Sequence, residues 1–385
     1  MAWRLVRHRT QQFNGQEYGE SITMHKGLPK NIPTKNASRS AGDSPISIFP
    51  PSARLHRSKI IRSLWPIFLT PNSDTEPLMN VLLAFDGSKS SVAALHDLAA
   101  AGLDADTRFL VVTVAEVWHP LEPESLEQDP LPEFIPTGLR SLHERSNREL
   151  SRAFQIADEG ADLLRNSFPA ATINAQAYAD SPSLGILAQA EEWGAEMIVV
   201  GAQGRSMLGR LLLGSVSHKV LAEAHCPVRI GRAKPHRRSG PPRLLLGVDG
   251  SIGSERMVEM VASRRWPAGA EARIVSALDL YFPTVFPQQS EESEEWFAAN
   301  HNRQRERMEE VAASVASRLQ GVGFGTSIMV QEGSPKKMLL QEAERMDADT
   351  IFLGAKGVRG LERFLLGSVS SAVATRAGCS VEVIR

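Results

Sequence analysis

Short apolar runs alternate with longer amphipathic stretches from about residue 78 to the end of the chain. Asn80–Phe85 is the first such run, and the stretch after it places its apolar side chains on one helical face. Apolar runs of strand length that alternate with amphipathic stretches of helix length are typical of buried parallel strands joined by helices. The pattern therefore predicts an α/β protein built on open parallel sheets with helices on both faces.

The same plan of five strands occurs twice along the chain. The first set of strands is predicted at Asn80–Phe85, Arg108–Val114, Thr172–Tyr178, Glu196–Val200 and Pro227–Ile230. The second set is predicted at Arg243–Val248, Ala272–Leu278, Thr326–Val330, Thr350–Leu353 and Val381–Ile384. Helices are expected between them, including Ser91–Gly102, Thr137–Phe168 and Asn300–Leu319. The proline-rich stretch Trp118–Pro136 and the acidic stretch Glu291–Glu295 are predicted to be loops.

One glycine motif occurs in both sets, after the fourth strand of each. Its first copy is Gly201-Ala202-Gln203-Gly204, nine residues, and then Gly214-Ser215-Val216-Ser217. Its second copy is Gly354-Ala355-Lys356-Gly357, nine residues, and then Gly367-Ser368-Val369-Ser370. A glycine pair alone fits any strand-to-helix turn. The repeated gap and the repeated Gly-Ser-Val-Ser ending favour a binding site instead.

The chemistry of this motif suits an anionic ligand. Glycines just beyond a strand let the backbone approach a ligand where a Cβ would collide. The Gly-Ser-Val-Ser segments begin amphipathic stretches, so their backbone N–H groups lie unpaired at a helix N-terminus, which attracts anions. The serine hydroxyls at positions 215, 217, 368 and 370 are expected to add donors. We therefore predict a nucleotide, with ribose over the glycine pair and phosphates at the helix end.

Two aspartates are expected beside the motif. Asp86 and Asp249 each end the first strand of their set and begin an Asp-Gly-Ser sequence. In open α/β sheets the ligand lies at the carboxyl ends of the strands, where the strand order reverses. Each carboxylate is thus predicted to accept a hydrogen bond from the nucleotide or to help hold Mg²⁺ beside its phosphates. The alternative is that Asp-Gly-Ser is only a turn that caps a helix.

The repeats define the expected domains. Domain 1 is predicted over residues 78–232, a basic linker over 233–242, and domain 2 over 243–385. Residues 1–77 hold eleven Lys or Arg against five Asp or Glu, and they lack a sustained hydrophobic period. We expect this extension to be disordered or loosely attached, and Met79 is an alternative start of a shorter product. A basic tail can contact nucleic acid, but the absence of interleaved aromatic residues favours a solvated segment.

Composition narrows the class of protein further. Hydrophobic residues make up 42% and charged residues 23% of the chain, with a net charge of −1, which is ordinary for a globular protein. No segment is long and apolar enough for a membrane span, and the basic start lacks the apolar region of a secretory signal. Cys226 and Cys379 occupy equivalent places at the start of the last strands, where a small buried hydrophobe suits. We expect a cytoplasmic protein.

These residues resemble the universal stress protein family, whose nucleotide-binding members carry the glycine pair, nine residues, and a glycine followed by serine, threonine or asparagine. The resemblance covers about four fifths of the chain as two tandem copies. It implies two Rossmann-like five-stranded parallel sheets similar to adenine nucleotide alpha hydrolases, and ATP, AMP or ADP as ligand. It implies that backbone at Val114 and Ala277 holds adenine, that Val200 and Leu353 pack near the base, and that the glycines contact the ribose.

Several functional alternatives stay open. The main hypothesis is a nucleotide-dependent regulatory or stress-response protein. The second is an enzyme, such as a slow ATPase or phosphotransferase. The chain lacks a GxxxxGK[ST] loop and a Ser-His-Asp or Cys-His set, and it leaves Asp86 and Asp249 as the carboxylates to suspect. The third is a non-catalytic scaffold.

Assembly is predicted from the resemblance as well. Single-domain members dimerise through the last strand. Here Pro227–Ile230 and Val381–Ile384 are expected to pair edge to edge, so that the two domains form an intramolecular pseudo-dimer. A homodimer of chains is a further option.

Overall fold

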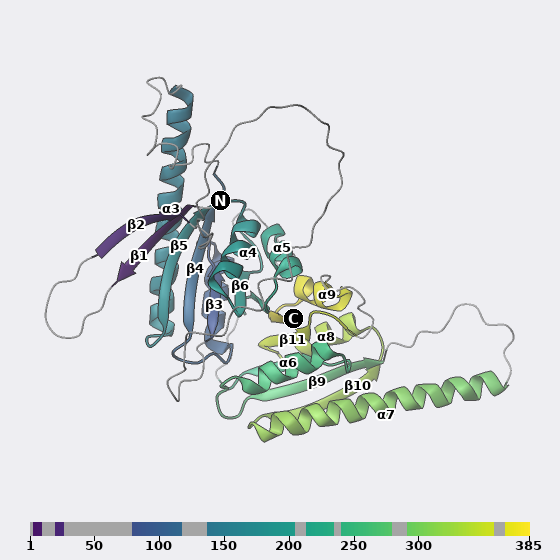
Figure 1. The fold of residues 1–385 in the computed structure, drawn as a ribbon. Helices are drawn as coiled ribbons and strands as arrows, with labels where there is room; N and C mark the ends of the chain where they lie inside the picture. The colour runs from purple at the N-terminus through teal and green to yellow at the C-terminus, as the bar shows by residue number, and fades with distance from the viewer. Residues whose placement is uncertain are drawn as a thin grey trace, which may run out of the picture. The chain divides into compact units, whose positions relative to one another are not determined.

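The computed structural model describes residues 3–9, 20–26, 79–117, 137–204, 213–234, 240–278, 291–357 and 366–385 (Figure 1). The predicted loop over residues 118–136 lies outside the described residues. So do residues 235–239 of the predicted linker, and residues 205–212 and 358–365 between the glycine pairs and the Gly-Ser segments. All ten strands predicted for the two repeats lie in the described part.

Domain 1 contains five strands and the helices between them. Its strands are β3 (Asn80–Ala84), β4 (Arg108–Ala115), β5 (Thr172–Ala179), β6 (Met197–Gly201) and β7 (Val228–Gly231). Its helices are α1 (Lys89–Asp97), the short 3₁₀ helix η2 (Leu98–Ala100), α3 (Thr137–Ser167), α4 (Pro182–Trp193) and α5 (Ser215–Glu223). Pro182 stands in the first turn of α4, where its missing N–H has no partner to lose.

Domain 2 repeats the order of domain 1. Its strands are β8 (Arg243–Gly247), β9 (Glu271–Leu278), β10 (Gly325–Glu332), β11 (Thr350–Gly354) and β12 (Ser380–Ile384). Its helices are α6 (Ile252–Ser263), α7 (Glu291–Gly321), α8 (Pro335–Arg345) and α9 (Ser368–Arg376). The predicted strands agree with the observed ones to within about two residues, which is the usual uncertainty of element ends.

Two segments differ from the sequence-based expectations. The acidic stretch Glu291–Glu295, expected to be a loop, forms the first turns of α7. Negative side chains suit a helix N-terminus because the helix dipole is positive there. Within the extension expected to be disordered, the structure has two strands, β1 (Trp3–Arg9) and β2 (Glu20–Lys26), which pair antiparallel with each other. β1 also pairs with the free edge of β5.

The strands of both domains form one continuous sheet. Its order is β10-β9-β8-β11-β12-β7-β6-β3-β4-β5-β1-β2. The strands within each domain run parallel. The expected pairing of the last strands is present, because β7 and β12 pair antiparallel, with Val381 opposite Ile230 and Val383 opposite Val228. The five strands predicted for each domain are therefore present. The two sets do not form separate sheets, because this edge pairing joins them into one.

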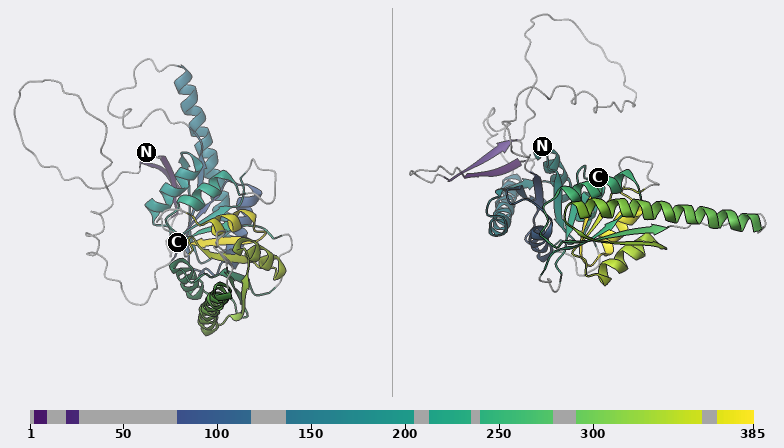
Figure 2. Two further views of the ribbon diagram at one scale, coloured as in Figure 1. Left: turned by 90° about the vertical axis from the view of Figure 1, so that its right-hand side faces the viewer. Right: turned by 90° about the horizontal axis from the view of Figure 1, so that it is seen from below.

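Helices cover both faces of the sheet (Figure 2). On one face, Ile186 of α4 and Leu221 of α5 share a core with Met338 of α8 and Val373 of α9. This shared core runs across both domains and includes Val228 and Ile230 of β7 and Val381 and Val383 of β12. On the other face each domain has its own core, under α1 and α3 in domain 1 and under α6 and α7 in domain 2.

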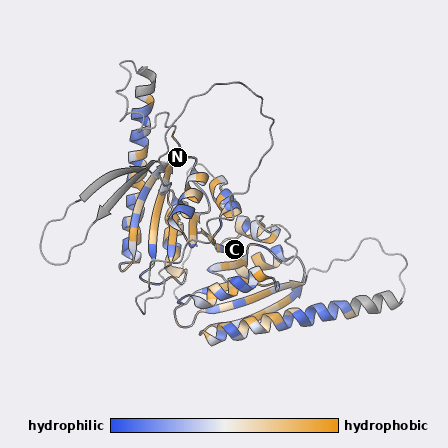
Figure 3. Cartoon of the chain, in the orientation of Figure 1, coloured by the Kyte–Doolittle hydropathy of each residue, from blue (hydrophilic) through white to orange (hydrophobic). Residues whose placement is uncertain are grey.

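Hydropathy follows this layering. In Figure 3 hydrophobic colour lies mainly on the strands and on the helices that pack against them, whereas much of α7 is hydrophilic. The buried strand residues are mostly Val, Ile and Leu, as expected for parallel strands covered on both faces.

Candidate functional site

The glycine motifs lie where the strand order of each domain reverses. β3, the first strand of domain 1, stands beside β6, the fourth, and β8 stands beside β11 in the same way. Asp86 follows β3 and Gly201 ends β6, so both sit at the carboxyl edge of this pair of strands. This switch point is the usual ligand position in open α/β sheets.

The first glycine of each pair is required by packing inside the protein. A Cβ on Gly201 would lie 2.8 Å from the backbone carbon of Ser90, at the start of α1. A Cβ on Gly354 would lie 2.7 Å from the backbone carbon of Gly253, at the start of α6. Real Cβ atoms do not approach backbone this closely, so these two glycines let a helix start press against the strand end. Their expected ribose contact is not needed to explain them.

The second glycine of each pair faces the aspartate. A Cβ on Gly204 would lie 3.5 Å from Oδ2 of Asp86, which is an ordinary contact. A Cβ on Gly357 would lie only 2.5 Å from Oδ2 of Asp249. Both glycines are exposed. The structure thus brings together the glycine and aspartate that the sequence assigned to one site, and it does so in both domains.

The other carboxylate oxygen of each aspartate takes part in a turn. Ser88 N–H donates to Asp86 Oδ1 at 3.0 Å, and Ser251 N–H donates to Asp249 Oδ1 at 3.1 Å. The glycines between them have positive φ, 75° at Gly87 and 71° at Gly250, which L side chains rarely adopt. Ser88 and Ser251 then cap α1 and α6. The turn-and-cap alternative is therefore present, and Oδ1 of each carboxylate accepts its hydrogen bond.

The Gly-Ser helix starts are tied back to the strands. Gly214 N–H donates to Ala202 O at 2.8 Å, and Gly367 N–H donates to Ala355 O at 2.7 Å. Each of these hydrogen bonds joins the residue before the helix to the residue that follows the first glycine of the motif. As a result, the amides of Gly214 and Gly367 are already bonded within the protein.

Two of the four predicted serine donors have a different partner. Ser217 Oγ donates to Gly201 O at 2.6 Å, and Ser370 Oγ donates to Gly354 O at 2.7 Å. Both side chains are buried. Each hydroxyl hydrogen is used to fix the helix to the strand end, because a strand-terminal carbonyl would otherwise lack a partner. The expectation that these hydroxyls donate to phosphate does not fit this arrangement.

The first amides of each helix start precede the hydrogen-bond ladder of their helix. The first hydrogen bond inside α5 is from His218 N–H to Gly214 O, and Ser371 N–H makes the equivalent bond in α9. The amides of residues 215–217 and 368–370 therefore have no carbonyl inside their own helix. Ser215 and Ser368 are exposed. These helix starts keep the amide array that favours an anion.

The residues predicted near the base lie on the same edge with different exposure. Val200 and Leu353 are buried in the shared core, 3% and 4% exposed. Val114 and Ala277 are half-buried near the ends of β4 and β9. Lys356 is half-buried within the glycine turn, and its carbonyl accepts a hydrogen bond from Ser251 Oγ. Arg205 and Arg359, the basic residues that follow the glycine pairs in the sequence, lie outside the described residues.

One residue at the site was not identified from the sequence. Ser90 Oγ accepts a hydrogen bond from Gln203 N–H at 3.0 Å, which fixes the turn between Gly201 and Gly204. Gly253 occupies the equivalent position in domain 2 and has no side chain to offer. The sequence carries a sign of this difference between the domains, because aligning the two Asp-Gly-Ser sequences places Ser90 opposite Gly253.

Metal sites, membrane-spanning helices and reactive cysteines were considered in the part of the chain that the structure describes. Among those residues no group of three or more His, Cys, Asp or Glu side chains is arranged to hold a metal ion. Within the same residues no helix has both the length and the apolar run needed to cross a bilayer. Burial raises the pKa of Cys226 to about 11 and that of Cys379 to about 12, so both thiols stay protonated at neutral pH.

Comparison with known proteins identifies the repeats. The model of the "Universal stress protein family" matches residues 78–232 and 242–385. "Universal stress protein Rv2623" of Mycobacterium tuberculosis is 27% identical over 325 residues, which cover 80% of this chain and 96% of that protein. "Universal stress protein Rv2005c" of the same organism is 31% identical over 207 residues, which cover 50% of this chain and 62% of that protein.

A solved structure shares the fold of both domains. The crystal structure of a universal stress protein from Archaeoglobus fulgidus superposes with a TM-score of 0.52 at 22% sequence identity. The superposition covers 80% of this chain and 98% of that one. At this identity the similarity supports the tandem α/β fold.

Proposed function

Because the chain belongs to the universal stress protein family through two tandem domains, we propose that each domain binds an adenine nucleotide, ATP or AMP, and that the protein is a nucleotide-dependent regulator of a cytoplasmic stress response. The observation that carries this proposal is the site built twice. In each domain an exposed glycine faces an aspartate, and a helix whose first amides have no carbonyl partner within that helix starts just beyond the same strand end.

The proposed binding mode follows from the donors present. The amides of residues 215–217 and 368–370 bind the phosphates, and the exposed hydroxyls of Ser215 and Ser368 add donors. The ribose lies over Gly204 or Gly357, where a side chain would fill the space. Backbone near Val114 or Ala277 holds the adenine.

Asp86 and Asp249 fit a supporting role toward Mg²⁺. Each has one oxygen, Oδ1, in the turn and the other, Oδ2, directed toward the exposed glycine. Mg²⁺ in nucleotide sites is commonly held by one or two carboxylates together with phosphate oxygens and water. A bound Mg²⁺ would neutralise phosphate charge, and a single aspartate per site matches that sharing of ligands.

The assembly proposed for the nucleotide-bound protein is an intramolecular pseudo-dimer of the two domains. The antiparallel pairing of β7 with β12 supports it, because it joins equivalent strands of the two repeats. Homodimerisation of whole chains through another surface remains part of this proposal.

Calorimetric titration of Mg²⁺-ATP into the full chain tests the proposal. We expect two sites in the unmodified chain, one site in Gly204→Val and in Gly357→Val, and none in the double variant. Gly321→Val is the matched control, since nothing lies within 4 Å of the Cβ that it would add. Absence of binding to the unmodified chain, after removal of co-purified nucleotide, would refute nucleotide binding and leave a scaffold.

The same preparation separates a regulator from an enzyme. Phosphate release is measured with ATP in excess over the protein. Release that disappears in Asp86→Asn and Asp249→Asn while binding persists would replace the regulatory proposal by a slow ATPase.

A further inference from the structure

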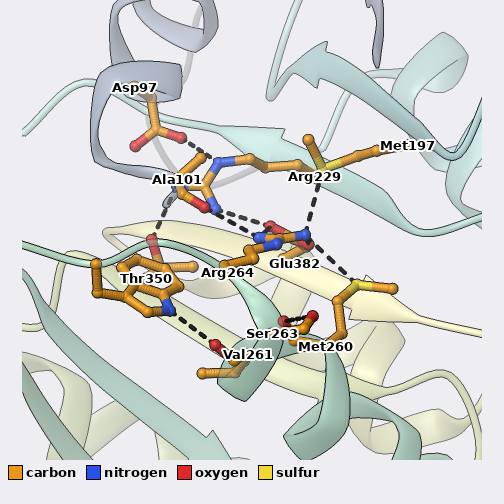
Figure 4. Close-up of polar contacts among 11 residues, drawn as sticks. Asp97, Ala101, Met197, Arg229, Met260, Val261, Ser263, Arg264, Thr350 and Glu382 are labelled. Atoms are coloured by element: carbon orange, nitrogen blue, oxygen red, sulfur yellow. Dashed lines mark hydrogen bonds and ion pairs between the residues drawn. The ribbon is translucent and has the colours of Figure 1, made fainter. Parts of the chain in front are cut away.

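A row of four charged side chains crosses the junction between the two domains. Arg229 of β7 and Glu382 of β12 form its centre, with Arg229 Nη1 at 2.9 Å from Glu382 Oε2. Arg229 Nε lies 2.7 Å from Asp97 Oδ2 at the end of α1. Glu382 also accepts hydrogen bonds from Nη1 and Nη2 of Arg264, the residue that follows α6. Figure 4 shows this row, which we call the charged row.

The charged row is buried where a core would otherwise continue. The side chains of Arg229 and Glu382 have 0% exposure, and that of Arg264 has 5%. Because side chains alternate along a strand, Val228, Ile230, Val381 and Val383 face the shared core, whereas Arg229 and Glu382 face α1 and α6. The row therefore separates the two domain-specific cores on that face.

Most donors and acceptors of the row are paired within the part of the chain that the structure describes, with Arg264 Nε the exception. Thr350 Oγ accepts from Arg229 Nη2 at 2.9 Å, and Ala101 O accepts from Arg264 Nη1 at 3.1 Å. Burial alone would raise the pKa of Glu382, but Arg264 and Arg229 outweigh it and hold that pKa below its usual range. Burial alone would lower the pKa of Arg229, but the neighbouring Asp97 and Glu382 carboxylates raise it, so Arg229 and Glu382 stay charged at neutral pH.

Buried charge of this kind is a poor source of stability. Well-packed apolar residues often replace a buried ion pair at no cost, whereas removal of one partner is strongly destabilising. Stability therefore does not explain the row, and specificity of strand pairing can. Like charges directly opposite each other disfavour an antiparallel pair, whereas opposite charges do not.

The two central residues occupy equivalent positions of the repeat, since Arg229 and Glu382 are 153 residues apart, as are the glycine motifs. Along the row the charges alternate: Asp97, Arg229, Glu382, Arg264. Two copies of domain 1 joined through β7 would place Arg229 opposite Arg229. Two copies of domain 2 joined through β12 would place Glu382 opposite Glu382. Alternation is obtained only when the two kinds of domain meet.

We propose that Arg229 and Glu382 are a pairing code that makes the β7 edge accept the β12 edge and reject a second copy of itself, so that the partner of each domain is the other domain of the chain. The linker acts in the same direction, because only eleven residues separate Gly231 from Arg243, which raises the effective concentration of one domain near the other. This inference deepens the pseudo-dimer proposed above and is independent of nucleotide binding.

Two full-length charge-reversal variants test the code. Arg229→Glu makes both last-strand edges acidic, and Glu382→Arg makes both basic. Each variant alone should lose the internal pairing. When they are mixed, domain 1 of the Glu382→Arg chain and domain 2 of the Arg229→Glu chain both keep native residues and can rebuild the complete row between chains.

The readout is capture of untagged protein by a tagged chain. Tagged Glu382→Arg should retain Arg229→Glu about tenfold better than it retains untagged Glu382→Arg or the unmodified chain, which corresponds to roughly 1.4 kcal/mol. Circular dichroism of each variant checks that its domains are folded. Equal capture of all three folded proteins would overturn the proposal. Association of whole chains through another surface adds the same capture to all three proteins, so it does not remove a difference between them.

Milder variants keep the proposal testable if a reversal prevents folding. Arg229→Gln, Glu382→Gln and the double variant form a double-mutant cycle. We expect the double variant to lose less in denaturation midpoint than the sum of the two single losses, because each single variant already breaks the Arg229–Glu382 ion pair and leaves one of these two charges without the other. Additive losses would overturn the code. The nucleotide titration is run on the same proteins, so failure of binding and failure of the code are seen separately.

Discussion

Domains 1 and 2 share the construction of the edge that carries the glycine motif but differ at the last strand. In both, the first glycine of the motif packs against a helix start, and the glycine before the next helix donates a hydrogen bond to the glycine turn. In both, a buried serine of that helix donates to the carbonyl at the strand end. In contrast, one central last-strand residue is Arg229 in domain 1 and Glu382 in domain 2. Features that serve a site within each domain are thus repeated, whereas the feature that joins the domains is complementary.

The largest expected effect on stability comes from removing one charge of the Arg229–Glu382 pair. Glu382→Gln leaves Arg229 and Arg264 facing each other without the carboxylate between them. We expect a loss of about 3–5 kcal/mol in unfolding free energy, the usual cost of breaking a buried pair, measured by urea denaturation. Glu344→Gln on the exposed side of α8 is the control and should change stability by about 0.5 kcal/mol or less. Equal losses in the two variants would contradict a buried role for Glu382.

A smaller effect separates the two glycines of each pair. Gly201→Ala and Gly354→Ala force a Cβ against backbone, so we expect a loss of about 1–3 kcal/mol in both domains. Gly204→Ala makes only an ordinary contact and should leave stability nearly unchanged. Thermal denaturation without ligand checks the order. A Gly204→Ala variant as unstable as Gly201→Ala would show that the second glycine is structural too.

The second glycines of the two domains differ in how close an added Cβ would come to the aspartate. The Cβ of Gly357→Ala would displace the Asp249 carboxylate, whereas that of Gly204→Ala would not displace Asp86. If the aspartates help to bind the nucleotide, Gly357→Ala weakens the domain 2 site more than Gly204→Ala weakens the domain 1 site. The same calorimetric titration measures both.

The smallest effect concerns a difference between the two turns. Ser90→Ala removes the acceptor for Gln203 N–H, and domain 2 has no such hydrogen bond because Gly253 stands there. We expect a loss of about 0.5–1.5 kcal/mol, the net value of one hydrogen bond, with Lys89→Ala as an exposed control. Faster amide exchange at Gln203 should accompany it. Unchanged exchange would mean that the serine does not hold the turn.

Much of the fold could be predicted because its signals are local. The apolar runs such as Asn80–Ala84 and Thr350–Gly354 give the strands directly, and the repeat gives the domain plan. The start of α7 was mispredicted because a run of glutamates has low hydrophobicity, although acidic residues suit a helix N-terminus. The strands β1 and β2 carried no recognisable period among their charged residues.

The site was predicted less completely because residue type does not reveal which partner a group will choose. Ser215 and Ser217 look alike in the sequence, yet Ser217 donates to Gly201 O and Ser215 is exposed. Asp97 and Arg264 could not be connected to Arg229 from sequence distance alone. A signal existed in the last strands themselves, where Val-Arg-Ile and Val-Glu-Val place single opposite charges at equivalent positions between apolar residues.

The antiparallel pairing of β7 with β12 fixes the directions in which the two edges open. All strands of domain 1 run parallel to β7 and all strands of domain 2 run parallel to β12, so the carboxyl ends of the two sets point in opposite directions. Asp86 and Asp249 accordingly lie at opposite margins of one sheet. A single ligand cannot bridge the two sites, and one flat protein surface cannot read both at once. Any signal that depends on the occupancy of both sites must be read by two molecules, by one that reaches around the sheet, or by the sheet itself.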